Sequence, residues 1–246
     1  MMAAMMTVCN PGDKVAVFSP FYENYGADAI LSGADPIYVP LVPPDFHYDS
    51  EALERAFQAG AKALILCNPS NPCGKVFTME EMEEIAELAK RYDAFVITDE
   101  VYEYIIYGEN RHISMAALPG MYERTITCSS LSKTYSMTGW RLGYAACNEE
   151  IVKTVNKLHQ HVVTCATSFV QKAGVVALKE EKNEVTDMVK EYQRRRDYAV
   201  KAINEIDGLS CRCPKGAFYI FINIEKLGMT GQEFAPLLLE NAKVAL

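Results

Sequence analysis

The sequence predicts an α/β fold with a mostly parallel, doubly wound sheet, followed by part of a smaller C-terminal α+β domain. As far as Cys147, short apolar runs rich in β-branched residues alternate with amphipathic stretches. The runs are too continuously apolar for half-exposed antiparallel strands, so we expect strands buried on both faces. After Cys147 the alternation ends and long helical patterns begin, which predicts domains at 1–182 and 183–246.

The first domain alternates predicted strands and helices. The predicted strands are Val15–Ser19, Pro36–Leu41, Ala63–Cys67, Ala94–Thr98, Thr125–Ser129 and Leu142–Cys147. Helical periodicity marks Glu51–Ala59 and Glu80–Arg91, and Thr78 and Glu81 have capping-box spacing at the start of the second helix. Strand and helix in repetition place helices on both faces of a parallel sheet.

The later part of the chain is mainly helical. We expect a helical region over Glu149–Lys182, interrupted near Thr164–Ser168, and a second long helix over Glu184–Ile206. Short apolar runs at Ser210–Cys213 and Phe218–Ile224 are predicted strands of the smaller domain, and a last helix begins near Thr230. The final residues, from Asn241 on, resemble a helix end that enters a strand.

Composition and charge exclude several classes of protein. The 246 residues carry 24 Lys and Arg against 32 Asp and Glu, a net charge of −8, which argues against nucleic acid and anionic lipid as partners. Met1–Cys9 could be a short signal h-region, but it has no basic residue before it and leads into a turn, so we favour the end of a core helix. No apolar stretch approaches the roughly 18 residues of a membrane span.

The eight cysteines lie mostly within apolar runs, which favours free thiols in a reducing compartment, the cytoplasm, over a disulfide framework. We expect no metal site, because Cys211 and Cys213 lack a second pair and His159 and His161 point to different faces of a helix.

Polar side chains follow three successive predicted strands. Asn71 lies in a turn after Cys67, Asp99 and Tyr102 follow Thr98, and Ser130 and Lys133 follow Ser129. Taken singly, each has an ordinary structural alternative: Asn71 as a turn former, Asp99 and Ser130 as helix caps, Tyr102 as a core aromatic and Lys133 as a solvated charge. Because the carboxyl ends of parallel strands meet at one edge, where open sheets bind ligands, we expect them to converge there.

These segments resemble the pyridoxal-phosphate enzymes of aminotransferase class I and II, which have fold type I and include aspartate aminotransferase. The matching segments are N-P-S-N-P-C-G at 68–74, D-E-V-Y at 99–102, S-L-S-K-T-Y-S-M-T-G-W-R-L-G at 130–143, N-P-G-D at 10–13 and S-P-F-Y at 19–22. The resemblance implies a pyridoxal-phosphate-binding large domain at 1–182, an L-amino acid and a 2-oxo acid as substrates, and a homodimer. It also implies a place in amino acid metabolism and biosynthesis.

The resemblance assigns a role to each candidate residue. Lys133 would form the imine with the cofactor and move the proton between the substrate's α-carbon and the cofactor, and Asp99 would keep the pyridine nitrogen protonated. Asn71 and Tyr102 would donate to the ring's 3-oxygen. The phosphate would be bound by Ser130 and Arg141, because an arginine can bond two oxygens of a dianion. Tyr22 would stack on the pyridine ring, although Phe21 and Tyr25 compete for that place.

The sequence also departs from the family pattern at both ends. The family has a further segment before Asn10, with the first central strand and a phosphate-binding turn, and an arginine for the substrate carboxylate toward the C-terminus; none of Lys215, Lys226 and Lys243 matches that arginine. We therefore expect a fragment of a transaminase of the aspartate or aromatic type, with weak cofactor binding and impaired activity. The alternatives are a carbon–sulfur β-lyase on the same cofactor and a non-catalytic, dimerising fragment.

Overall fold

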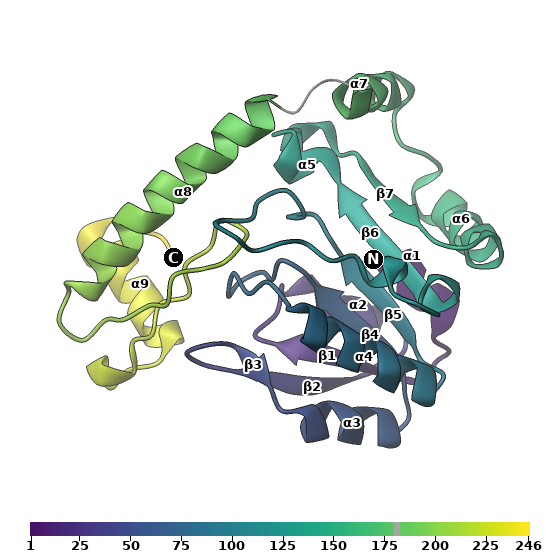
Figure 1. Ribbon diagram of the computed structural model, residues 1–246, viewed down its shortest axis with the longest axis horizontal. Coiled ribbons are helices and arrows are strands. Elements are labelled where there is room, and N and C mark those ends of the chain that lie inside the picture. Colours follow the sequence, from purple (N-terminus) through teal and green to yellow (C-terminus); the bar gives the residue numbers. More distant parts are fainter. Residues whose placement is uncertain (180–182) are drawn as a thin grey trace.

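A mixed, mostly parallel sheet forms the centre of the protein (Figure 1). The computed structural model describes residues 1–179 and 183–246. The seven strands lie in the order β3-β2-β1-β4-β5-β6-β7, where β3 and β7 run antiparallel to their neighbours and the other strands are parallel. Their bounds are β1 Lys14–Ser19, β2 Asp35–Val42, β3 His47–Tyr48, β4 Ala61–Cys67, β5 Phe95–Asp99, β6 Thr125–Ser130 and β7 Gly143–Ala146.

Helices surround the sheet and extend beyond it on one side (Figure 1). They are α1 Met2–Val8, α2 Asn24–Leu31, α3 Ser50–Gln58, α4 Met79–Arg91, α5 Leu131–Thr134, α6 Glu149–Val163, α7 Ser168–Lys179, α8 Asn183–Asn204 and α9 Gly231–Ala242. Short 3₁₀ turns lie at Met115–Ala117, Tyr122–Arg124, Thr138–Trp140 and Glu225–Leu227. The predicted capping box is confirmed, since Thr78 and Glu81 bond each other's backbone N–H at the start of α4.

The sheet is covered on both faces, as a doubly wound fold requires. Val15 and Val17 of β1 pack into a core with side chains of α1 and α2, whereas Ala16 and Phe18 pack into the opposite core with α3 and α4. Alternate residues of one strand therefore serve two cores, which explains why the central strands are continuously apolar. The predicted fold class is confirmed, and the opening segment forms α1, a helix that buries Ala4 and Met5.

The prediction that every strand is buried on both faces is wrong for β7 and β2. All four residues of β7 are exposed, because β7 is the last strand of the order. β2 is only partly buried, because its sole outer neighbour is the two-residue strand β3. Every neighbouring pair in the order is hydrogen-bonded, so the sheet is continuous from β3 to β7. Another strand could join this sheet only at the β3 or β7 edge.

The helices and strands predicted after Cys147 are partly confirmed. The helical interruption falls at residues 164–167, between α6 and α7, and α8 and α9 match the last two predicted helices. Residues 180–182, and with them the predicted domain boundary, lie outside the described residues. The predicted strands at 210–213 and 218–224 are wrong: Ser210 and Asn223 form one isolated bridge, as expected of a ribbon without further strands beside it. No strand follows α9 in residues 243–246.

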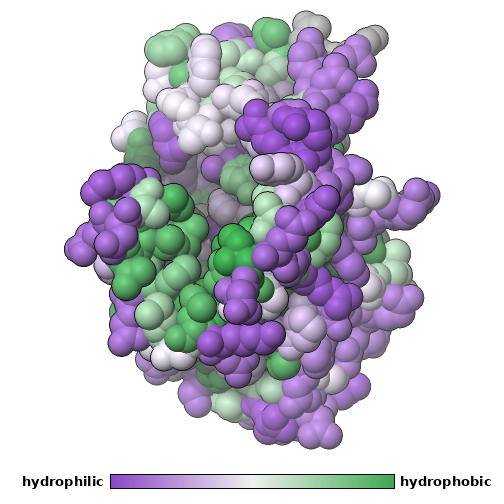
Figure 2. All heavy atoms as spheres, turned by 90° about the vertical axis from the view of Figure 1, so that its left-hand side faces the viewer, coloured by the Kyte–Doolittle hydropathy of each residue, from purple (hydrophilic) through white to green (hydrophobic). Residues whose placement is uncertain are grey.

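The segment at 214–219 returns from α8 to the sheet and docks on the turn after β4. Gly74 O accepts hydrogen bonds of 3.0 Å from the backbone N–H groups of Lys215 and Gly216. The Ala217 N–H donates to Ile105 O over 2.9 Å, and Ala217 is fully buried. Figure 2 shows this side of the molecule, where hydrophobic residues gather around a hollow and hydrophilic residues surround them. The C-terminal part of the chain is thus fixed to the loops that follow the strands.

Gly74 is required by this docking. It has a φ of +66°, and a Cβ there would overlap Pro214 and lie 3.0 Å from Gly216 O. We expect Gly74→Ala to lower the free energy of unfolding by about 2–4 kcal/mol, through backbone strain and overpacking. Gly108 is the matched control, because its φ is +64° but a Cβ there would meet nothing within 4 Å. Equal losses for the two variants, measured by urea unfolding, would show that the docking contact contributes nothing.

Among residues 1–179 and 183–246, no helix has both the length and the apolarity needed to cross a membrane.

Candidate active site

The turn after β4 is held by a buried asparagine. Asn68 is 1% exposed, and its backbone N–H donates to Asp99 O over 3.1 Å. Its side-chain oxygen accepts from Phe77 N–H at 3.2 Å, and its amide nitrogen donates to Ile113 O at 3.4 Å. These bonds fix the turn against the end of β5 and so set where Asn71 lies.

Asp99 ends β5 and lies beneath a tyrosine from α2. The Tyr25 hydroxyl donates to Asp99 Oδ2 over 2.8 Å, and the Val101 N–H donates to Oδ1 over 3.2 Å. Burial raises the pKa of Asp99, while these two hydrogen bonds act in the opposite direction. Both donors are neutral groups, so a positive charge placed beside Asp99 would favour its charged form.

Asn71 and Tyr102 are joined by a residue that the sequence did not indicate. The Tyr219 hydroxyl lies 2.8 Å from the Tyr102 hydroxyl and accepts a hydrogen bond of 3.3 Å from Asn71 Nδ2. Burial is the main cause that raises the pKa of Tyr102 and of Tyr219. Both phenols therefore keep their protons at neutral pH and can act as hydrogen-bond donors.

Lys133 lies in α5, the short helix that follows β6. Ser130 caps this helix, since its Oγ accepts from the Ser132 N–H over 3.1 Å. Lys133 Nζ lies 5.4 Å from the centre of the Phe218 ring, which contacts the Tyr102 ring edge-on at 5.3 Å. Phe218 therefore links Lys133 to the group formed by Tyr102, Tyr219 and Asn71, and the predicted convergence is seen for these side chains.

Ser130 and Arg141 each bond a backbone carbonyl of the segment 138–142. Ser130 Oγ is 3.0 Å from Leu142 O, and Arg141 Nη1 donates to Thr138 O over 3.0 Å. Arg141 also lines an open cavity of about 830 Å³, together with Trp140 and His159. The hydrogen bonds and ring contacts that connect Asn71, Tyr102 and Lys133 do not extend to Arg141 within the described residues.

The three candidate aromatics of the 19–25 segment separate in space. Phe21 stacks on Tyr38 with ring centres 5.1 Å apart, and Tyr25 bonds Asp99. Tyr22 remains 38% exposed, with its ring edge-on to Tyr25 at 5.7 Å. Of the three, Tyr22 is therefore the ring that is left accessible to a ligand beside Asp99.

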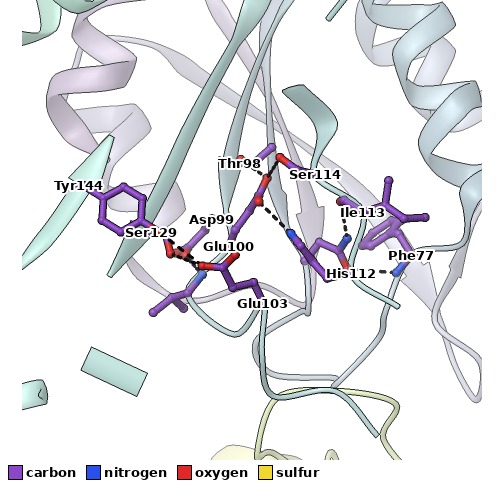
Figure 3. A network of polar contacts seen from close by, with 12 residues as sticks. Phe77, Thr98, Asp99, Glu100, Glu103, His112, Ile113, Ser114, Ser129 and Tyr144 are labelled. Atoms are coloured by element: carbon purple, nitrogen blue, oxygen red, sulfur yellow. Dashed lines mark hydrogen bonds and ion pairs between the residues drawn. The ribbon is translucent and has the colours of Figure 1, made fainter. Parts of the chain in front are cut away.

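A buried carboxylate next to Asp99 organises the end of β5 (Figure 3). Glu100 Oε1 accepts from Thr98 Oγ1 at 2.9 Å and from Ser114 Oγ at 3.0 Å. Its other oxygen, Oε2, lies 2.8 Å from His112 Nε2. The Glu100 side chain is 5% exposed, so these contacts replace the water that a carboxylate otherwise needs. The loop at 112–114 is thereby tied to the strand that ends in Asp99.

The same region contains the one group of possible metal ligands found among the described residues. Glu100, Glu103 and His112 each offer a ligand atom, and these atoms lie within 4.8 Å of one another. Protein donors already engage the carboxylates, since Glu103 Oε1 also lies 3.3 Å from Ser129 Oγ. We therefore describe the group as a hydrogen-bond network and assign no metal to it.

The Glu100 network should contribute strongly to stability. Glu100→Leu leaves the Thr98, Ser114 and His112 side chains without their acceptor, and we expect a loss of at least about 3 kcal/mol, because each buried unpaired group costs about 1–3 kcal/mol. Glu103→Leu is the control: its oxygen Oε1 accepts only long bonds, of 3.3 and 3.4 Å, so we expect a loss below about 1 kcal/mol. Thermal unfolding would test this, and equal losses would contradict it.

Comparison with known proteins identifies the family. The sequence model described as aminotransferase class I and II matches residues 1–246. The chain belongs to this family. The resemblance indicated by the sequence motifs is thus confirmed, and the match covers all 246 residues.

Individual aminotransferases match closely but are longer. The aspartate aminotransferase of Musicola paradisiaca is 41% identical over 244 residues, which are 98% of this chain and 61% of that protein. The aromatic aminotransferase of Pyrococcus horikoshii OT3 superposes with a TM-score of 0.95 at 40% identity, covering 99% of this chain and 66% of that one. A putative aminotransferase from Clostridium difficile 630, solved with bound pyridoxal phosphate, gives a TM-score of 0.93 at 25% identity over 100% and 65% of the two chains. The chain thus spans about three fifths of the length of the curated relatives that it matches.

Proposed function

We propose that this protein catalyses pyridoxal-phosphate-dependent transamination between an L-amino acid and a 2-oxo acid. The observation that carries the proposal is Asp99, a partly buried carboxylate with neutral donors at the end of β5, together with Lys133, which follows the neighbouring strand β6. Similarity to aspartate and aromatic aminotransferases favours those amino acids as substrates. We further propose a cytoplasmic homodimer, and eight free cysteines are consistent with a reducing compartment.

The chemistry of the described donors fits pyridoxal phosphate. Asp99 would hold the protonated pyridine nitrogen, since a cation relieves the cost of a partly buried carboxylate. Asn71 and Tyr102 would donate to the ring's 3-oxygen, and Tyr22 would cover the ring face. Ser130 and Arg141 would bind the phosphate. We also propose that residues 1–182 form the cofactor-binding domain and 183–246 a linking helix with part of a smaller domain.

Two of the chain's own residues would act on protons in the reaction. When bound, pyridoxal phosphate withdraws electrons from the substrate's α-carbon. Asp99 holds a proton at the pyridine nitrogen, so that the ring can accept those electrons. Lys133 moves a proton between the substrate's α-carbon and the C4′ carbon of the cofactor, which requires Nζ to be a free amine at that step.

Two assays on the purified chain test this function. Titration with pyridoxal phosphate, followed by absorbance, measures cofactor binding, and 2-oxo acid formation from an amino acid is then measured with and without a 2-oxo acid acceptor. Transamination requires the acceptor, whereas a β-lyase forms the 2-oxo acid without it. Absence of cofactor binding would contradict the proposed function.

A further inference from the structure

Tyr219 comes from the C-terminal segment, yet it lies among side chains that follow β4 and β5. Its hydroxyl contacts Asn71 and Tyr102, at 3.3 and 2.8 Å. Its ring lies edge-on to Tyr102 at 5.8 Å and packs on Phe218 at 4.8 Å. The backbone just before it is fixed by Ala217, which is fully buried and bonds Ile105 O. The position of the Tyr219 hydroxyl is therefore set by packing.

The hydrogen-bonding capacity of these groups gives the contacts a direction. A phenol has one O–H to donate and can accept through its oxygen. Asn71 Nδ2 can only donate, so the Tyr219 oxygen accepts that bond. The Tyr219 O–H can then be donated to the Tyr102 oxygen, 2.8 Å away. In this arrangement the Tyr102 O–H is free to point at a ligand, and each bond in the series polarises the next.

We propose that Tyr219 is a positioning residue: its hydroxyl, bonded to Asn71 and Tyr102, directs the Tyr102 proton toward the 3-oxygen of the cofactor. This inference rests on the proposed function, in which Asn71 and Tyr102 hold that oxygen. It adds a residue from the C-terminal part of the chain to a site otherwise built by the loops that follow the strands. Tyr219 acts through Tyr102 and does not itself touch the reacting atoms.

The inference predicts a spectroscopic change. A proton donated to the 3-oxygen stabilises its negative charge and makes the neighbouring imine nitrogen less basic. If Tyr219 directs that donor, Tyr219→Phe weakens it, and the imine nitrogen keeps its proton to higher pH. We expect the pH midpoint of the bound cofactor's absorbance change to rise by about half a unit to one unit, the effect of losing one hydrogen bond.

The experiment uses the full chain loaded with pyridoxal phosphate and titrated with base. Tyr219→Phe keeps the ring and its packing, so a purely structural role leaves the midpoint unchanged. Tyr192→Phe is the matched control, because the Tyr192 ring packs on the same Phe218 at 5.5 Å, and we expect it to leave the midpoint in place. In a Tyr102→Phe background, Tyr219→Phe should add less than half of its single effect, because Tyr219 acts through Tyr102.

The outcomes separate this inference from the function on which it rests. An unchanged midpoint in Tyr219→Phe, or a full additional shift in the Tyr102→Phe background, would overturn the role of Tyr219 while cofactor binding stands. If the unmodified chain gives no cofactor absorbance band, the proposed function fails and this inference fails with it. The inference is supported if Tyr219→Phe raises the pH midpoint and if most of that rise is missing when Tyr219→Phe is made in the Tyr102→Phe background.

Discussion

Lys133→Arg should abolish covalent attachment of pyridoxal phosphate and lower the transamination rate by at least about a thousandfold. Arginine stays protonated at every physiological pH, so it can neither form the imine nor take a proton from the substrate's α-carbon. It does keep a cation near the Phe218 ring, where Lys133 Nζ lies 5.4 Å from the ring centre. The variant therefore removes the chemistry of the amine with little change in packing.

Borohydride reduction and peptide mapping provide the direct measurement. In the unmodified chain the pyridoxyl label should be found on the peptide that contains Lys133, and in Lys133→Arg it should be absent. Lys153→Arg serves as a control, because Lys153 is an exposed residue that pairs with Glu149 on α6. A label found mainly on another lysine of the unmodified chain would show that Lys133 is not the attachment site.

Asp99→Asn should keep the cofactor bound and lower the rate by roughly a hundredfold to a thousandfold. The amide preserves the shape of the carboxylate and can still accept a hydrogen bond from Tyr25 or Val101. It carries no charge to hold a proton on the pyridine nitrogen, and losing such electrostatic stabilisation costs about that factor. Rate and cofactor affinity are measured on the same preparation, and near-normal turnover would contradict the assigned role.

The same substitution should stabilise the protein when no cofactor is present. Burial raises the pKa of Asp99 in the folded chain above the value of about 3.9 in unfolded chains. Between these values the folded state binds more protons, so its stability falls as the pH rises through this window and stays lower above it. Asparagine does not ionise and avoids this loss. At pH 7 we expect Asp99→Asn to unfold at a temperature about 2–4 °C higher than the unmodified chain. This is the shift that a gain of about 1 kcal/mol in unfolding free energy causes in a protein of this length.

This difference should shrink as the pH is lowered below about 4, where Asp99 is protonated in both states. Asp187→Asn is the control: Asp187 is an exposed residue paired with Lys190, and its loss should change the unfolding temperature little at either pH. A lower unfolding temperature for Asp99→Asn at pH 7 would show that the Asp99 charge stabilises the ligand-free fold.

The sequence by itself determined the central sheet and the edge at which chemistry is expected. Continuously apolar runs predict β1, β4 and β5 because strands covered on both faces need apolar side chains on both sides. The α4 cap is equally readable, since Thr78 and Glu81 are three residues apart. Asn71, Asp99 and Lys133 could be placed together because parallel strands bring their carboxyl ends to one edge.

Only the tertiary structure decided which side chains meet at that edge. Tyr25 bonds Asp99 across 74 residues, and Tyr219 bonds Tyr102 across 117. It also decided that β7 is exposed and that the runs near 210 and 220 form one bridge and no strand. Periodicity and spacing report only local structure, whereas these contacts depend on how distant elements pack, and pairing between distant residues leaves no regular pattern in one sequence.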